Sequence, residues 1–153
     1  GDMVITCLFT HDIFPIIRFN THDVTRCLTT PSQLRLPFRR IEGFLGRSDN
    51  MVKLRGINVF PQALSSILAE MPGFNGEYLC VLTRDASGRE DLLVRIESTQ
   101  ARGPGQVQAC AALLKRRLGV EVGVELVEPR ALSALTGVES RQKPIRLLDQ
   151  RKA

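Results

Sequence analysis

The stretch GRSDNMVKLRGINVFP, residues 46–61, decides how the rest of the sequence is interpreted. Two short apolar runs flank Arg55–Gly56, which predicts a β-hairpin with a tight turn at that pair. Pro61 then suits the first turn of a helix. A hairpin needs turn residues only at its tip, yet the polar residues Arg47–Asp49 stand directly before it. These side chains therefore call for a functional explanation.

Downstream of the hairpin, strand-like and helix-like patterns alternate. Apolar residues recur at helical spacing in two segments, and the second of these ends at Gly119, a typical helix stop. The predicted elements are a hairpin at 51–60, a helix at 61–71, strands at 78–85 and 90–98, a helix at 105–118 and a strand at 120–129. This order predicts the α+β class, with residues 50–129 forming one sheet in a two-layer split β-α-β (ferredoxin-like) domain that carries both helices on the same face.

Upstream of the hairpin, the sequence predicts a small β unit. Strands are expected at 2–9, at 11–20 and at 39–47, and Pro15 places the second strand at an edge or bulge. The turn-rich segment 21–33 follows that second strand. The unit is too short for a closed core of its own, so it is expected to pack on something else. We place the domain division at 1–48 and 49–153, and we expect a polar, basic tail after a short turn at 130–135.

Composition fits an ordinary soluble globular chain, with 43% hydrophobic and 24% charged residues among 153. No apolar run approaches the roughly 20 residues needed to cross a bilayer, and the first residues lack the basic start of a signal peptide. The four cysteines have no metal-ligand spacing, so no metal site is predicted. They are interpreted as reduced, mostly buried thiols of a cytoplasmic protein.

Basic residues are unevenly distributed in a chain of net charge +5. Such clusters attract polyanions, either nucleic acid or the phosphates of a nucleotide or coenzyme. A solvated basic face is the plainer interpretation of any single cluster. One cluster comprises Arg35, Arg39, Arg40 and Arg47, and the other comprises Arg141, Lys143, Arg146, Arg151 and Lys152.

Three phrases occur in an order that resembles the adenylate-forming acyl-CoA ligases, most closely the phenylacetate-CoA ligase branch. They are PIIRFNTHDVTR at 15–26, GRSDNMVKLRGINVFP at 46–61 and IRLLDQRK at 145–152, with GDMVIT at 1–6 in support. The resemblance runs from Gly1 to the end but covers only the last part of such an enzyme. It implies adenylation of a carboxylate by ATP, followed by transfer of the acyl group to coenzyme A.

The resemblance also implies roles for five residues. Asp23 matches an acid that accepts hydrogen bonds from the ribose hydroxyls, and Arg47 matches a basic residue close to ribose and phosphate. Asp49 matches the hinge between the domains. Gly56 matches a hairpin glycine beside the path of the pantetheine arm of coenzyme A. Lys143 matches the catalytic lysine that reaches the α-phosphate and the substrate carboxylate.

This sequence departs from the family pattern at three positions. His22 stands where glycine is usual before Asp23, and a solvent-facing turn histidine is favoured there over a catalytic base. Gln142 and Pro144 flank Lys143, where glycine usually precedes the lysine. The resemblance implies ATP, Mg²⁺, coenzyme A and an aryl carboxylic acid as ligands of the full-length enzyme. The fragment itself is expected to be inactive and to need the missing N-terminal domain as its partner, with homodimerisation as an open option.

Two other classes of function stay open from the residues alone. A nucleic-acid-binding module agrees with the charge and the sheet, but Tyr78 is the only aromatic residue in the two central strands on which a base could stack. A stand-alone regulatory or scaffolding domain would keep the ligase-like phrases without the chemistry.

Overall fold

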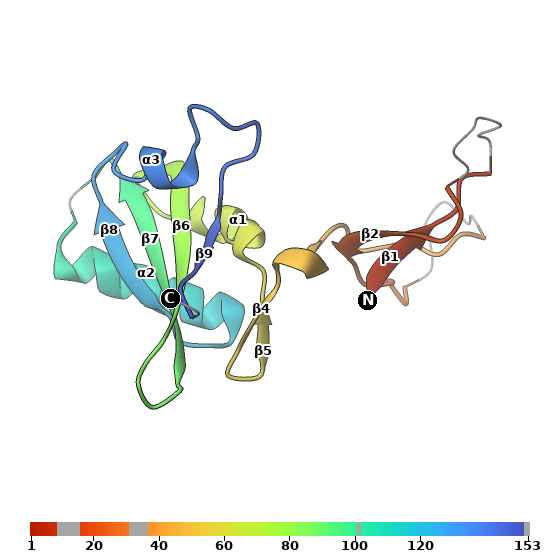
Figure 1. The fold of residues 1–153 in the computed structure, drawn as a ribbon, viewed down its shortest axis with the longest axis horizontal. Helices are drawn as coiled ribbons and strands as arrows, with labels where there is room; N and C mark the ends of the chain where they lie inside the picture. Colours follow the sequence, from red (N-terminus) through yellow and green to blue (C-terminus); the bar gives the residue numbers. More distant parts are fainter. Residues whose placement is uncertain (9–15, 31–36, 101, 152–153) are drawn as a thin grey trace. The chain divides into compact units, whose positions relative to one another are not determined.

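The computed structural model describes residues 1–8, 16–30, 37–100 and 102–151 (Figure 1). It divides into two compact units, Gly1–Met51 and Val52–Ala153, called unit 1 and unit 2 below. Three features of the sequence fall outside the described residues: the first half of the strand expected at 11–20, with Pro15, and the basic residues Arg35 and Lys152.

Unit 1 is a three-stranded antiparallel sheet in the order β1-β2-β3. Strand β1 spans Asp2–Ile5, β2 spans Phe19–Val24 and β3 is only Gly46–Arg47. A 3₁₀ helix, η1, follows at Ser48–Asn50. The strand expected over 39–47 is therefore reduced to its last two residues and an isolated bridge between Cys27 and Ile41.

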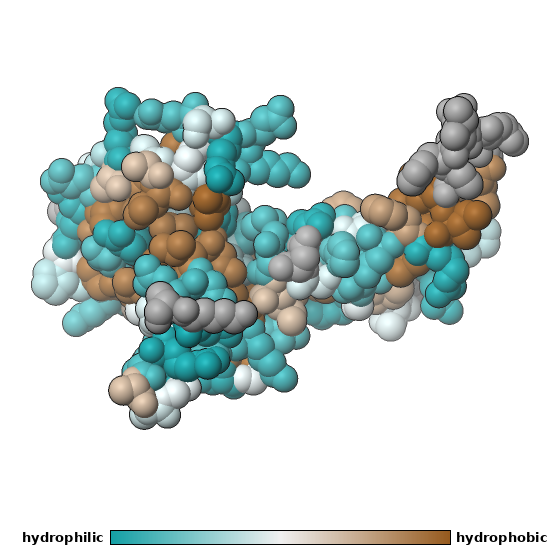
Figure 2. All heavy atoms as spheres, viewed as in Figure 1, coloured by the Kyte–Doolittle hydropathy of each residue, from teal (hydrophilic) through white to brown (hydrophobic). Residues whose placement is uncertain are grey.

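The described side chains of unit 1 include none that is buried. Several large apolar side chains are instead strongly exposed, among them Leu8 at 78%, Phe38 at 74% and Ile17 at 67%. Figure 2 shows the corresponding hydrophobic surface on the part of the molecule that carries β1 and β2. Three short strands do not enclose a core, as expected for so small a sheet.

Unit 2 begins with the expected hairpin. Strand β4, Val52–Leu54, pairs with β5, Ile57–Val59, and the two form a sheet of their own. The chain then enters a 3₁₀ turn, η2, at Pro61–Ala63, which continues into helix α1 at Leu64–Leu68. The helix predicted at 61–71 thus begins where expected but ends three residues early, at Leu68, and the chain then turns at Gly73, which has a φ of +80°.

The main sheet of unit 2 has four strands in the order β8-β7-β6-β9. Strands β6, Phe74–Arg84, and β7, Glu90–Ser98, form the antiparallel centre. Strand β8, Gly123–Val127, lies parallel to β7, and β9, Leu147–Asp149, lies parallel to β6.

Two longer connections complete unit 2. Helix α2, Pro104–Leu118, joins β7 to β8 and ends at Gly119, whose φ of +74° suits a residue without a side chain. A one-turn helix, α3, at Ser133–Thr136 lies between β8 and β9. None of the helices in the described ranges is long and apolar enough to span a membrane.

The core lies between the main sheet and the layer of α1 and α2. Leu64 and Leu68 of α1 share one buried cluster with Cys110 and Leu114 of α2. The same cluster contains alternate residues of the two central strands, as the period of a pleated strand requires. The prediction that both helices cover one face is therefore confirmed. A smaller cluster around Leu132 lies on the other face of the sheet.

The α+β class is confirmed, but the expected extent of the sheet is wrong. Residues 50–129 do not form one sheet, because the hairpin at 51–60 pairs only with itself in the described structure. The fourth strand is β9, in the segment expected to be a polar tail. Leu147 packs against the larger core cluster and Ile145 against the smaller one, which holds this segment against β6. The cysteine prediction holds for half of the thiols, since Cys80 and Cys110 are buried while Cys7 and Cys27 are exposed.

Tyr78 connects the sheet to the helical layer. Its side chain is 1% exposed, and its hydroxyl lies 2.8 Å from the Pro61 carbonyl oxygen and 3.2 Å from that of Gln62. Burial raises the pKa of Tyr78 from 10.0 to about 12. A buried phenol with these partners presents no ring face to solvent, so it cannot stack on a nucleic-acid base.

The raised pKa predicts a loss of stability at alkaline pH. The unfolded state gives up the Tyr78 proton first, so the contribution of Tyr78 to stability is complete below pH 10 and falls as the pH rises toward 12. At pH 11 the loss from this group is about 1.4 kcal/mol. Urea unfolding at pH 8 and pH 11 should show it. Tyr78→Phe removes a hydrogen bond at both pH values but abolishes this titration, so the stability gap to the wild type should narrow at pH 11. An equal gap at both pH values would contradict the prediction.

Candidate functional site

Asp23 and Arg47 lie side by side in unit 1. They are directly opposite each other on the neighbouring strands β2 and β3. Arg47 Nη1 lies 3.7 Å from Asp23 Oδ1 and donates a hydrogen bond to the Thr21 carbonyl oxygen at 3.2 Å. Both side chains are partly exposed, at 37% for Arg47 and 30% for Asp23. A carboxylate and a guanidinium thus lie together at a partly exposed position of the sheet.

A bulge, and not a turn, positions Asp23. Asp2 pairs with Val24 and Val4 pairs with Asn20, so three residues of β2 face a single residue of β1. His22 occupies the left-handed region with φ of +61°, and its N–H bonds to Asn20 Oδ1 at 2.8 Å. The predicted turn at Thr21–Asp23 is therefore wrong: the strand continues through it, and the bulge re-aims the side chains.

A polar network that the sequence did not predict lies beside this pair. Asn20 Nδ2 and Ser48 Oγ donate to Asp2 Oδ2 at 3.2 Å and 3.0 Å. The hydrogen bonds from Asn20 and, next, from Ser48 lower the pKa of Asp2 below its usual value. Ser48 Oγ also lies 3.3 Å from the His22 carbonyl oxygen. The polar residues before the hairpin thus contact β1 and β2. Asp2 and Ser48 are 46 positions apart, and only the strand pairing could have revealed their contact.

The predicted hinge residue lies in a short helix. The backbone of Asp49 is the middle of η1, and the division between the two units falls after Met51.

The hairpin tip requires residues with positive φ. Arg55 has φ of +48° and Gly56 has φ of +84°, the combination found in two-residue turns of the I′ type. A Cβ at Gly56 would meet no atom within 4 Å. Glycine is therefore favoured at this position by its positive φ, and not by a lack of space for a side chain. The tip borders a cavity of about 410 Å³ lined in part by Arg55 and Arg89, and Arg55 forms an ion pair with Asp91.

Lys143 lies in the connection between α3 and β9, and its side chain is exposed. Among the residues that the structure describes, its ammonium group has no hydrogen-bond or ion-pair partner. Gly56 and Lys143 belong to unit 2, whereas Asp23, Arg47 and Asp49 belong to unit 1. Of the five predicted site residues, Asp23 and Arg47 are the two that the structure places in contact.

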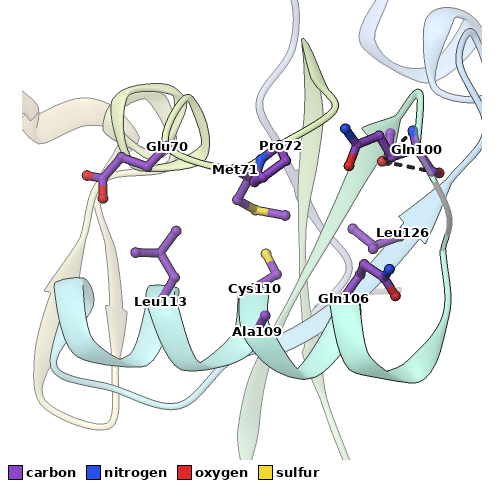
Figure 3. Close-up of a pocket in the computed structure, with 10 residues that line it drawn as sticks. Glu70, Met71, Pro72, Gln100, Gln106, Ala109, Cys110, Leu113 and Leu126 are labelled. Carbon is purple, nitrogen blue, oxygen red and sulfur yellow. Dashed lines mark hydrogen bonds between the residues drawn. The ribbon is translucent and has the colours of Figure 1, made fainter.

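A second cavity, of about 370 Å³, contains none of the predicted residues (Figure 3). It opens between the end of α1 and helix α2, where Met71, Leu113 and Leu126 supply apolar walls. Cys110 lines it as well, and burial raises the pKa of this thiol to about 11. The thiol is thus protonated at neutral pH and a poor nucleophile. Within the described ranges, no three His, Cys, Asp or Glu side chains are grouped to hold a metal ion.

Comparison with known proteins identifies the family. Residues 56–151 match the family described as AMP-binding enzyme C-terminal domain. A phenylacetate-coenzyme A ligase from Aromatoleum evansii is 32% identical over 144 residues, covering 89% of this chain and 32% of the relative. The chain thus spans about a third of the length of that curated relative.

Two solved structures are similar to the chain. One is 2-hydroxyisobutyryl-CoA ligase in the postadenylation state with R3-HIB-AMP, with a TM-score of 0.75 and 28% identity over 99% of this chain and 32% of that one. The other is a domain of phenylacetate-coenzyme A ligase from Bacteroides vulgatus, with a TM-score of 0.54 and 27% identity over 69% of this chain and 96% of that one. On this evidence, the chain belongs to the AMP-binding enzyme C-terminal domain family.

Proposed function

We propose that this chain is the C-terminal part of an ATP-dependent, AMP-forming acid–CoA ligase that acts on an aryl carboxylic acid such as phenylacetate. The carrying observation is the pairing of Asp23 with Arg47 on neighbouring strands. A carboxylate only accepts hydrogen bonds and suits the two hydroxyls of ribose, while a guanidinium suits phosphate. The similarity to a phenylacetate-coenzyme A ligase supports the class of acid.

The reaction has two half-reactions. In the first, an oxygen of the substrate carboxylate attacks the α-phosphorus of ATP, and pyrophosphate leaves. In the second, the sulfur of coenzyme A attacks the acyl carbonyl, and AMP leaves to give the thioester. Lys143 offsets the negative charge that develops during the first step. Support comes from its exposed ammonium group, which has no partner among the described residues.

The two units have separate roles in the proposal. Residues 1–48 form a piece of the large AMP-binding domain, and residues 49–153 form the mobile C-terminal domain that rotates between the half-reactions. Asp49 is the hinge. Support comes from the division of the chain into two units after Met51, two residues beyond Asp49. The lack of buried side chains in the described part of unit 1 is expected of a piece that the missing N-terminal domain completes.

Coenzyme A passes the hairpin tip at Gly56 in this proposal. The adjoining cavity with Arg55 and Arg89 offers guanidinium groups to its phosphates. ATP is used as its Mg²⁺ complex. The described residues provide no cluster of ligands for the ion, so no residue of this chain is assigned to hold it. The proposed enzyme is cytoplasmic. The isolated chain is proposed to form homodimers through the exposed apolar surface of unit 1, which the N-terminal domain would cover in the full-length enzyme.

The test is pyrophosphate release with ATP, Mg²⁺ and a panel of aryl acids, followed by thioester formation on adding coenzyme A. The full-length parent, meaning the ligase of which this chain forms the last part, should perform both steps. The present chain should release no pyrophosphate above a denatured control, because its sequence contains no Ser/Thr/Gly-rich loop to hold the ATP phosphates. Absence of both activities in the parent with every acid tested would overturn the proposed function.

A further inference from the structure

The segment that carries Lys143 is a closed loop. Residues 137–145, called the Lys143 loop, leave the end of α3 and return at the start of β9, beside β6 (Figure 1). The Ile145 N–H bonds to the Thr136 carbonyl oxygen at 2.9 Å, which joins the two ends. Compact surface loops of about 6–16 residues with adjacent ends are frequently functional. Lys143 is two residues from that closure.

One carboxylate contacts both ends of this loop. Glu77 Oε2 accepts hydrogen bonds from Thr136 Oγ1 at 3.2 Å and from Arg146 Nη1 at 3.1 Å, and Glu77 Oε1 accepts one from Arg146 Nη2 at 2.9 Å. Thr136 is the last residue before the loop, and Arg146 is the first residue after it. The side chains of Glu77 and Arg146 are only 17% and 16% exposed. A paired arrangement of this kind is weakly screened by solvent and favours a single geometry.

Further contacts fix the end of the loop at Arg146. The Arg146 guanidinium also donates a hydrogen bond to the Tyr78 carbonyl oxygen at 2.9 Å and lies 4.5 Å from the centroid of the Tyr78 ring. Its own carbonyl oxygen accepts the Cys80 N–H at 3.0 Å. Pro144, between Lys143 and the closure, disfavours the α region for Lys143. The proline that departs from the family pattern thus restricts the backbone at the lysine.

We infer that Glu77 is a positioning residue for Lys143, because it clamps both ends of the loop that presents the lysine. The inference rests on the proposed function of Lys143. Glu77 touches neither substrate nor lysine; it acts by reducing the number of conformations that the loop visits. Small displacements of a catalytic group cost rate without affecting binding elsewhere.

The loop itself can be tested in this chain without any activity. Glu77→Gln should speed hydrogen exchange at the Ile145 amide and lower the order of residues 138–143 in ¹⁵N relaxation. Glu90→Gln is the matched control, since Glu90 also lies in the main sheet and binds an arginine of the terminal segment, Arg151, at 3.0 Å. The control should leave the loop unchanged. Equal loop order in both variants and the wild type would overturn the inference.

A double-mutant cycle in the full-length parent tests the consequence. Glu77→Gln should slow adenylation about tenfold and leave thioester formation from supplied acyl-adenylate unchanged. In the Lys143→Ala background, Glu77→Gln should have no further effect on adenylation. Losses that add, or that fall on both half-reactions alike, would overturn the positioning role. If Lys143→Ala alone changes nothing, the proposed role of the lysine fails instead.

A milder variant covers the case in which Glu77→Gln does not fold. Thr136→Val removes the hydroxyl that donates to Glu77 but leaves the ion pair with Arg146 intact. It should loosen the end of the loop next to α3. It should also slow adenylation, by a smaller factor than Glu77→Gln, without slowing thioester formation. A folded Thr136→Val protein with wild-type loop order and adenylation rate would contradict the inference.

Discussion

Replacing Lys143 by alanine in the full-length parent is expected to slow adenylation about a hundredfold, the usual effect of removing one charged contact to a transition state. Thioester formation from supplied acyl-adenylate should be nearly unchanged. The side chain is exposed and has no partner in the described structure, so its removal should not lower stability. Single-turnover release of pyrophosphate and formation of the thioester measure the two steps separately.

Arg141→Ala provides the control for Lys143→Ala. Arg141 is an exposed cation in the same loop, so its loss changes the net charge of the loop equally. Arg141→Ala should slow adenylation only by the small amount that a weaker long-range attraction between the loop and ATP would cause. A similar loss in both variants would indicate that Lys143 acts only through long-range charge.

The second large effect is expected at the hinge. Asp49→Pro fixes φ near −65°, removes an N–H and disfavours the α region for Ser48. If the C-terminal domain rotates about this residue, pyrophosphate release in one turnover should survive while thioester formation falls about tenfold or more, because only the second step follows the rotation. Both half-reactions and the melting temperature should be measured on the same preparation.

Ala86→Pro is the matched control for the hinge variant. Ala86 is exposed in the β6–β7 turn, where the Gly88 N–H bonds to the Asp85 carbonyl oxygen at 3.0 Å, and proline is favoured at the second position of such a turn. This variant should leave both half-reactions intact. An unchanged ratio of the two rates in Asp49→Pro, with a lower melting temperature, would mean that Asp49 only supports the following hairpin.

Elements defined by local patterns were predictable from the sequence. Helix α2 has a proline at its start and a glycine with positive φ at its stop, and the hairpin has a two-residue tip with Gly56. Each of these features depends on residues only a few positions apart, so a short stretch of sequence is enough to predict it. The roles of Asp23 and Arg47 in one site were predicted from a family resemblance and not from a periodic pattern. Their position opposite each other on β2 and β3 depends on how these strands pair, which the local sequence does not specify.

Features that depend on distant residues were not predictable. Strand β9 is three residues long, too short for a periodic signal, and it is held by Arg146, whose partner Glu77 is 69 positions away. The bulge at His22 depends on the register between β1 and β2. Residues 21–24 are typical of turns, and there local preference gave way to strand pairing in β2.

The uneven distribution of buried side chains between the units has a consequence for recombination. Every buried hydrophobic residue of the described structure, from Val52 to Leu132, follows the boundary at Met51. A gene fusion made at that boundary would transfer the entire set of packed side chains as one block, so none would need a matching substitution upstream. Members of the family can therefore exchange this block by crossover, and chimeras joined between Met51 and Val52 should keep an intact core.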